Sequence, residues 1–129
     1  MAEDKDLNEK IFLQADQLTA IKPLRLQFYK GEVQLTQNNR DMIRQWATQI
    51  TKHNIPVYIH SFASSPTGIR NMSIDTAHHE AIRIAFNRGL LTKNFLEQSG
   101  INPDRLIIKA IGPGLSSIED SITITTRRN

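Results

Sequence analysis

The chain has 129 residues, of which 39% are hydrophobic and 22% are charged, which is the size and composition of one soluble domain with its own core. The absence of cysteine excludes disulfides, thiolate metal sites and cysteine nucleophiles. The net charge of +3 permits an acidic partner without requiring one, and the aromatic content of 6% argues against a stacking surface for single-stranded nucleic acid.

Residues 1–20 are polar and carry alternating charges. Leu7, Ile11 and Leu18 fall at roughly helical spacing, so the segment is compatible with a short amphipathic helix or with a flexible tether. The sequence has no signal peptide pattern and no run of about 18 apolar residues that would predict a membrane span. We expect a tether or short helix at 1–20 and a domain at 21–129.

Two strands and a helix are predicted in the first half of the domain. Alternation of apolar and polar residues predicts strands at 24–28 and at 57–62. Thr36 is a suitable N-cap for a helix between them. Turn-forming residues at 63–71 predict a loop. The helix that Thr36 caps has an apolar face, formed by Met42, Ile43, Trp46, Ala47 and Ile50.

A long helix is predicted from Ser73 or Asp75 to about Gln98, and Gly100 is placed to end it. Gly89 lowers helix propensity by about 1 kcal/mol relative to alanine, so we expect it to permit close approach of a strand or another helix. Two further strands are predicted at 105–111 and 121–125.

The predicted order of elements is β-α-β-α-β-β. Strands joined through helices favour a parallel or mixed sheet with both helices on one face. The sequence therefore predicts an α/β fold, a two-layer sandwich.

No pattern in the sequence predicts catalysis, a cofactor or a metal site. His78 and His79 are adjacent, so on a helix they point about 100° apart and cannot hold one metal together. Ser64 and Ser65 have no histidine and acid at a recognised spacing. The acidic pair at 119–120 is interpreted as a solvated turn. We expect a protein that is not an enzyme.

Two arginines, Arg83 and Arg88, lie among apolar residues of the predicted long helix. Burying a guanidinium costs free energy unless it is paired. The partner is either a carboxylate of a ligand or one of this chain, for which Asp75, Glu80 and Glu97 are the candidates.

Three motifs between residues 57 and 101 follow one another at defined spacing. They are Val57-x-Ile59-x-Ser61-Phe62-Ala63-Ser64, Ala81-x-x-Ile84-Ala85-x-x-Arg88-Gly89 and Leu96-x-x-x-Gly100-Ile101. With the strand-leading segment at 102–106, they resemble the OmpA C-terminal domain over residues 24–126. The helix motif at 81–89, including Arg83, resembles that of a divergent branch of the family.

The resemblance implies a non-catalytic domain that binds peptidoglycan in the bacterial periplasm. It implies that Arg88 takes a carboxylate of the diaminopimelate residue in the stem peptide. The family's aspartate, which takes the ammonium group, is replaced here by Ser64, and its asparagine by Ala81. We hypothesise that Asp75 supplies the missing negative charge. The expected binding residues are Arg88, Ser64, Ser65, Thr67, Asp75 and Arg83, and for Arg83 a structural ion pair is favoured over ligand contact.

The resemblance also implies partners. They are peptidoglycan and other envelope proteins, including those of a type IVB secretion complex at the outer membrane. No nucleic acid partner is expected, and the membrane is reached only through a lipid anchor outside this sequence. The alternative is an OmpA-like scaffold that contacts neighbouring proteins and binds no glycan. An open pocket at Arg88 favours binding, whereas a filled pocket favours the scaffold.

Overall fold

A four-stranded sheet organises the computed structural model, which describes residues 21–65, 72–111 and 120–127. The strand order is β1-β4-β2-β3, in which β2 and β3 are parallel and β4 is antiparallel to both β1 and β2. The sheet is therefore mixed, as predicted. Its strands are β1 (Leu24–Gln27), β2 (Val57–Phe62), β3 (Leu106–Ile111) and β4 (Ser121–Thr125).

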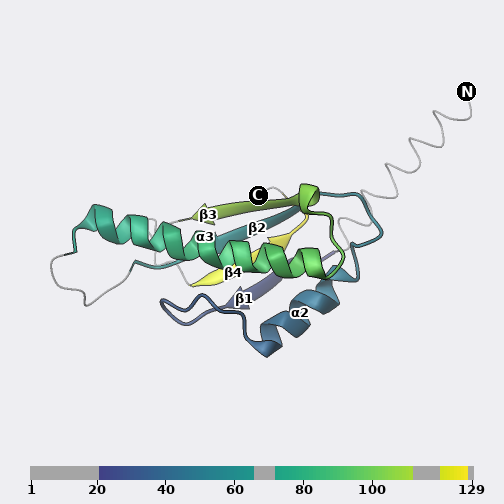
Figure 1. Cartoon of the computed structure of the whole chain (residues 1–129), viewed down its shortest axis with the longest axis horizontal. Coiled ribbons are helices and arrows are strands. Elements are labelled where there is room, and N and C mark those ends of the chain that lie inside the picture. Colours follow the sequence, from purple (N-terminus) through teal and green to yellow (C-terminus); the bar gives the residue numbers. More distant parts are fainter. Residues whose placement is uncertain (1–20, 66–71, 112–119, 128–129) are drawn as a thin grey trace, which may run out of the picture.

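Two α-helices, α2 (Gln37–Ala47) and α3 (Ile74–Gln98), lie on the same face of this sheet (Figure 1). A short 3-10 helix, η1 (Pro103–Arg105), leads into β3. The predicted α/β two-layer sandwich and its order of elements are confirmed. The tether or helix expected at 1–20 and residues 66–71 of the expected loop lie outside the described part of the chain.

The ends of the helices follow from local hydrogen bonding. The side chain of Thr36 accepts a hydrogen bond from the backbone N–H of Asn39, and that of Ser73 accepts one from Thr76, so each satisfies a free donor of a first turn. After α3 the chain reverses at Gly100, whose φ of +103° is in the region that favours glycine. No helix in the described ranges has the length and apolar character needed to cross a membrane.

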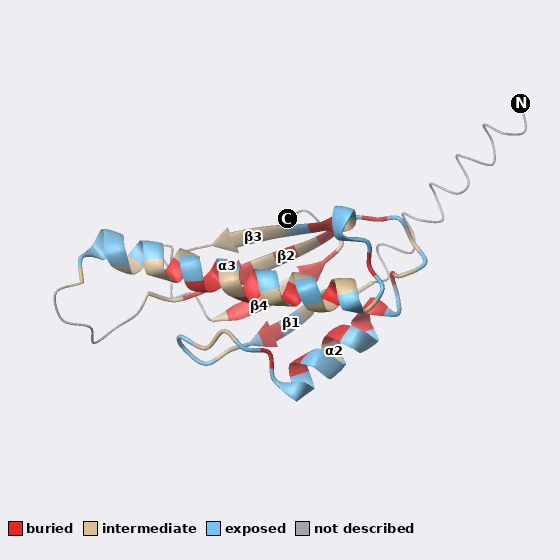
Figure 2. Cartoon of the chain, in the orientation of Figure 1, coloured by how far each residue is buried: buried red, intermediate tan, exposed pale blue. Residues whose placement is uncertain are grey.

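The core lies between the sheet and the two helices (Figure 2). Alternate residues of β2 are buried, which places Val57, Ile59 and Ser61 under the helices and the residues between them on the opposite face. The core is completed by apolar side chains of every element except η1, among them Leu26, Ile43, Trp46, Leu96, Leu106, Ile122 and Ile124.

Gly89 sets how closely α3 approaches the sheet. A Cβ atom at this position would lie 2.7 Å from Cγ2 of Ile108 on β3, which is closer than real side chains pack. The prediction that Gly89 permits close approach is confirmed. Its neighbour Arg88 is thereby held over the end of β2.

Candidate functional site

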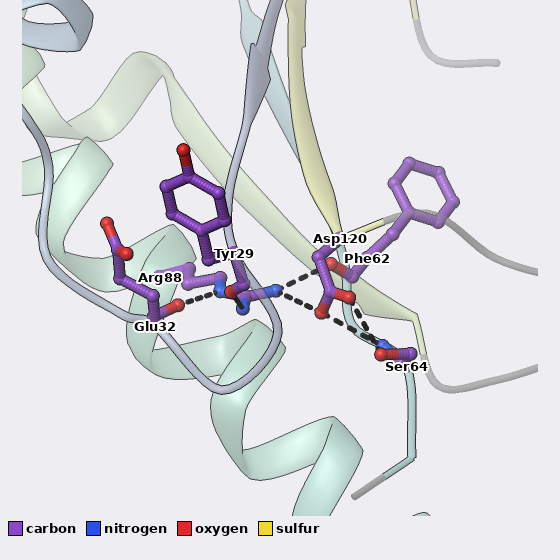
Figure 3. Close-up of polar contacts among 6 residues, drawn as sticks. All are labelled: Tyr29, Glu32, Phe62, Ser64, Arg88 and Asp120. Carbon is purple, nitrogen blue, oxygen red and sulfur yellow. Dashed lines mark hydrogen bonds and ion pairs between the residues drawn. The ribbon is translucent and has the colours of Figure 1, made fainter.

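Arg88 of α3 is the largest fully buried side chain in the described structure. Its guanidinium is enclosed by the segment between β1 and α2 on one side and by the ends of β2 and β4 on the other (Figure 3). A buried guanidinium persists only if its donors are paired. Its partners therefore decide what the site can do.

Backbone carbonyls accept most of the hydrogen bonds that the Arg88 guanidinium donates. Nε of Arg88 donates to the carbonyl of Glu32, Nη2 donates to that of Tyr29 at 3.1 Å, and Nη1 donates to that of Phe62 at 3.1 Å. Figure 3 shows the side chains of these three residues directed away from the guanidinium. The ring of Phe28 covers it, with 4.8 Å between the guanidinium carbon and the ring centroid.

Asp120 supplies the carboxylate. Its Oδ1 accepts from Nη1 of Arg88 at 2.9 Å and from the backbone N–H of Ser64 at 3.1 Å, and its Oδ2 accepts from Oγ of Ser64 at 2.7 Å. The Asp120 side chain is 11% exposed. Burial by itself raises the pKa of this carboxyl, but the hydrogen bonds from Ser64 and Arg88 outweigh it, so the pKa is lowered. Asp120 is held as an anion.

This arrangement corrects two predictions. The pair at 119–120 was interpreted as a solvated turn, yet the Asp120 carboxylate is largely buried and paired. None of the internal acids expected for Arg88 contacts it: Glu80 pairs with Arg83, Glu97 lies 3.8 Å from Lys93, and Asp75 is exposed in the first turn of α3.

The remaining predicted site residues do not gather at Arg88. Asp75 lies thirteen residues earlier on α3, which is about 20 Å along the helix axis, so it cannot supply the missing charge. The exposed Arg83 forms an ion pair with Glu80, as favoured for it. Ser65 is half-buried beside Ser64, and Thr67 lies outside the described residues.

A second, smaller apolar cluster packs α3 against the chain that follows β2. Ala63 and Ala81 are fully buried and pack with Ile84 and Ala85 in a cluster of their own. Ala81, at the position where the resemblance implies asparagine, is therefore part of the hydrophobic core. Of the histidines, His78 and His79 are exposed, and no cluster of potential metal ligands occurs in the ranges 21–65, 72–111 and 120–127.

Arg88, Asp120, Ser64 and the carbonyls of Tyr29, Glu32 and Phe62 form a closed hydrogen-bond network, which we call the polar lock. One guanidinium joins the turn at 29–32, the end of β2 and the Asp120 carboxylate at the start of β4, and none of its surface is exposed to a ligand in this conformation. Beside it, Asp120 and Ser64 are partly exposed.

Comparison with solved structures identifies the fold. The OmpA-like domain of FopA1 from Francisella tularensis superimposes with a TM-score of 0.61 at 16% identity, covering 79% of this chain and 69% of that one. The peptidoglycan-associated lipoprotein from Burkholderia pseudomallei gives 0.59 at 10% identity, covering 78% and 87%. The chain has the OmpA-like fold. The C-terminal domain of MotB from Helicobacter pylori agrees, with 0.56 at 20% identity, covering 83% and 87%.

This OmpA-like chain has no match at the level of sequence, either among protein-family models or among curated proteins.

Sequence reasoning did not identify Asp120 as the partner of Arg88. The pairing of Phe62 with Ser121 places residue 120 beside residues 63 and 64, but that register depends on strand pairing over a long sequence separation. An acid at the start of an alternating strand was the only local signal.

Proposed function

We propose that this chain is a non-catalytic peptidoglycan-binding domain that anchors an envelope assembly to the cell wall. The observation that supports it is the Arg88–Asp120 pair at the end of β2 in an OmpA-like fold. This is the region in which the resemblance assigns contact with the stem peptide. One structural relative is by name a peptidoglycan-associated lipoprotein, which agrees with the proposal.

In this proposal Asp120 does the work of the family's missing aspartate. Arg88 and Ser64 hold its carboxylate ionised, and its partly exposed edge is available to the ammonium group of diaminopimelate. Ser64 and Ser65 offer hydroxyl groups beside it. Arg88 then acts as a positioning residue for Asp120 and does not itself contact the ligand.

A second candidate is the OmpA-like scaffold that binds neighbouring proteins and no glycan. It is favoured by one specific observation: the donors of Arg88 are occupied by internal acceptors, and its side chain is fully buried. A carboxylate ligand would therefore have to displace Asp120 or the Tyr29–Glu32 turn to reach it.

Co-sedimentation with purified diaminopimelate-containing sacculi separates the two candidates. We expect the wild type to sediment and Asp120→Asn to bind about tenfold more weakly, a difference of about 1.4 kcal/mol. Arg83→Gln is the matched control, because Arg83 is an exposed arginine of the same helix whose ion pair lies outside the site.

Circular dichroism must show that each variant is folded. Absence of sedimentation by the folded wild type would reject glycan binding and leave the scaffold. Equal sedimentation of wild type and Asp120→Asn would reject the role given to Asp120.

The assembly and location follow as further parts of the proposal. A peptidoglycan anchor acts in the periplasm, and a secretion complex tethered to the outer membrane through a lipid anchor is the proposed assembly. Fractionation of cells carrying the native protein, followed by detergent extraction, tests both parts: recovery in the cytosol would contradict them.

A further inference from the structure

The sheet face opposite the helices carries a row of basic side chains. Arg25 of β1 pairs with Thr123, which pairs with His60 of β2, and His60 is in register with Lys109 of β3. The residues next to them in each strand face the helices, so these three side chains lie on the opposite face. A basic row therefore crosses the sheet from one edge strand to the other.

Apolar side chains flank this row on both sides. Tyr58 is in register with Ile107, and Phe62 is in register with Ile111, again across β2 and β3. Ile107 is 38% exposed. An occupant that suits this face has carboxylates along one line and apolar residues beside them.

A pocket of about 280 Å³ opens on the same face. It is lined by Pro23, His60, Phe62, Thr123, Thr125 and Arg127. Within the described part of the chain, Nε2 of His60 is buried and has no hydrogen-bond partner. An unpartnered buried polar atom costs free energy, which an acidic occupant would recover by pairing with it.

The pKa of His60 also agrees with an acidic occupant of this face. Its pKa is lowered, first by burial and in smaller part by the charge of Lys109, against a hydrogen bond with the backbone of Arg127 that raises it. A carboxylate placed here would favour the protonated imidazole, so its charge would raise the pKa of His60 against both of the lowering effects.

We propose that residues 1–20 of the same chain dock on this face, with their carboxylates along the basic row and their apolar residues against the flanking rows. The segment carries five carboxylates against two lysines, in a chain whose overall charge is +3. Its Leu7, Ile11 and Leu18 recur at roughly helical spacing. Its acidic residues are Glu3, Asp4, Asp6, Glu9 and Asp16.

The connection and the length also suit this occupant. The segment runs into Ile21, which packs against the core on the helix side, and then into Pro23, which lines the pocket on the opposite face, so it joins the domain beside the edge strand β1, within reach of this face. Twenty residues span about 30 Å even as a helix, whereas four paired strands are only about 15 Å across from first to last. The segment can therefore cross the whole basic row.

The test is paramagnetic relaxation in the full chain. Because the chain has no cysteine, Asn8→Cys provides a single site for a nitroxide label. We expect the amide signals of Ile107 and Lys109 to lose most of their intensity, while those of Phe86 and Leu90, exposed on α3 of the other layer, keep theirs.

Two matched variants of the labelled chain test the charge pairing. Neutralising Asp6, Glu9 and Asp16 together (Asp6→Asn, Glu9→Gln, Asp16→Asn) should restore the Ile107 and Lys109 signals. Neutralising the lysines (Lys5→Gln, Lys10→Gln) should leave them broadened. Equal effects of the two variants would overturn the charge pairing that the docking depends on.

Two further outcomes would overturn the proposal. Weak broadening spread equally over both layers would show an undocked tether. Broadening of an isotope-labelled chain by a separate nitroxide-labelled chain would show that a second copy occupies the face. Sedimentation with sacculi is not part of this test, so its result leaves the docking proposal intact.

Discussion

Nη1 of Arg88 and Oδ1 of Asp120 lie 2.9 Å apart inside the protein, although the two residues are 32 positions apart in the sequence. The same carboxylate accepts two hydrogen bonds from Ser64. Helix α3, the end of β2 and the start of β4 are thereby tied together at one point.

Removal of the guanidinium should be strongly destabilising. Arg88→Met leaves the Asp120 carboxylate without its cation and leaves buried carbonyls without donors, so we expect a loss of about 3–5 kcal/mol in the free energy of unfolding, measured in urea. Arg83→Met, which removes an exposed ion pair of the same helix, should cost much less, because water screens that pair. Similar losses for the two variants would contradict the buried lock.

The stability of the fold should fall in acid partly through Asp120. The pKa of its carboxyl is lower in the folded chain than the usual value of about 3.9 in unfolded chains. Its contribution is therefore complete above about pH 4 and is lost as the pH falls through the folded-state pKa. The difference in unfolding free energy between wild type and Asp120→Asn should shrink from pH 6 towards pH 2. A constant difference would contradict this pairing.

An aspartate at position 64 should be able to replace Asp120 as the ion-pair partner of Arg88. Ser64→Asp alone places a second anion beside Asp120, so it should be destabilising at pH 7 and less so at pH 4. Asp120→Asn in the same chain relieves that repulsion and leaves one carboxylate for Arg88. We expect a coupling of about 0.5–3 kcal/mol in a double-mutant cycle. Additive effects would show that the two positions do not share a partner.

The approach of α3 to the sheet should depend on the absence of a side chain at Gly89. Gly89→Ala places a methyl group against Cγ2 of Ile108, and we expect a loss of about 1–3 kcal/mol, despite the better helix propensity of alanine. Ile108→Leu removes the branching methyl, so Gly89→Ala should cost less in that background. Thermal unfolding of the four proteins measures this, and a stabilised Gly89→Ala would contradict the packing.

Much of the fold could be predicted from local pattern. The strand at Val57–Phe62 follows from its alternation, α2 from Thr36 and its apolar face, and the end of α3 from Gly100, because each signal lies within one element. The small residue at position 89 also indicated close packing, although the side chain it meets belongs to β3.

The candidate site was less accessible to sequence reasoning. Arg88 could be marked as a buried cation that needs a partner, but the nearest acids along the helix were the wrong choices. Glu80 and Asp75 share α3 with it, yet helical geometry directs one to Arg83 and places the other about 20 Å away.

Local patterns were enough to predict the strands and helices of the domain, their order and the need of Arg88 for an anion. That Asp120 is this anion, and that backbone carbonyls close the rest of the site, became visible in the folded chain. Strand register and loop closure bring together residues that lie far apart in the sequence. Local periodicity predicts which way a side chain faces, but not which distant group it meets.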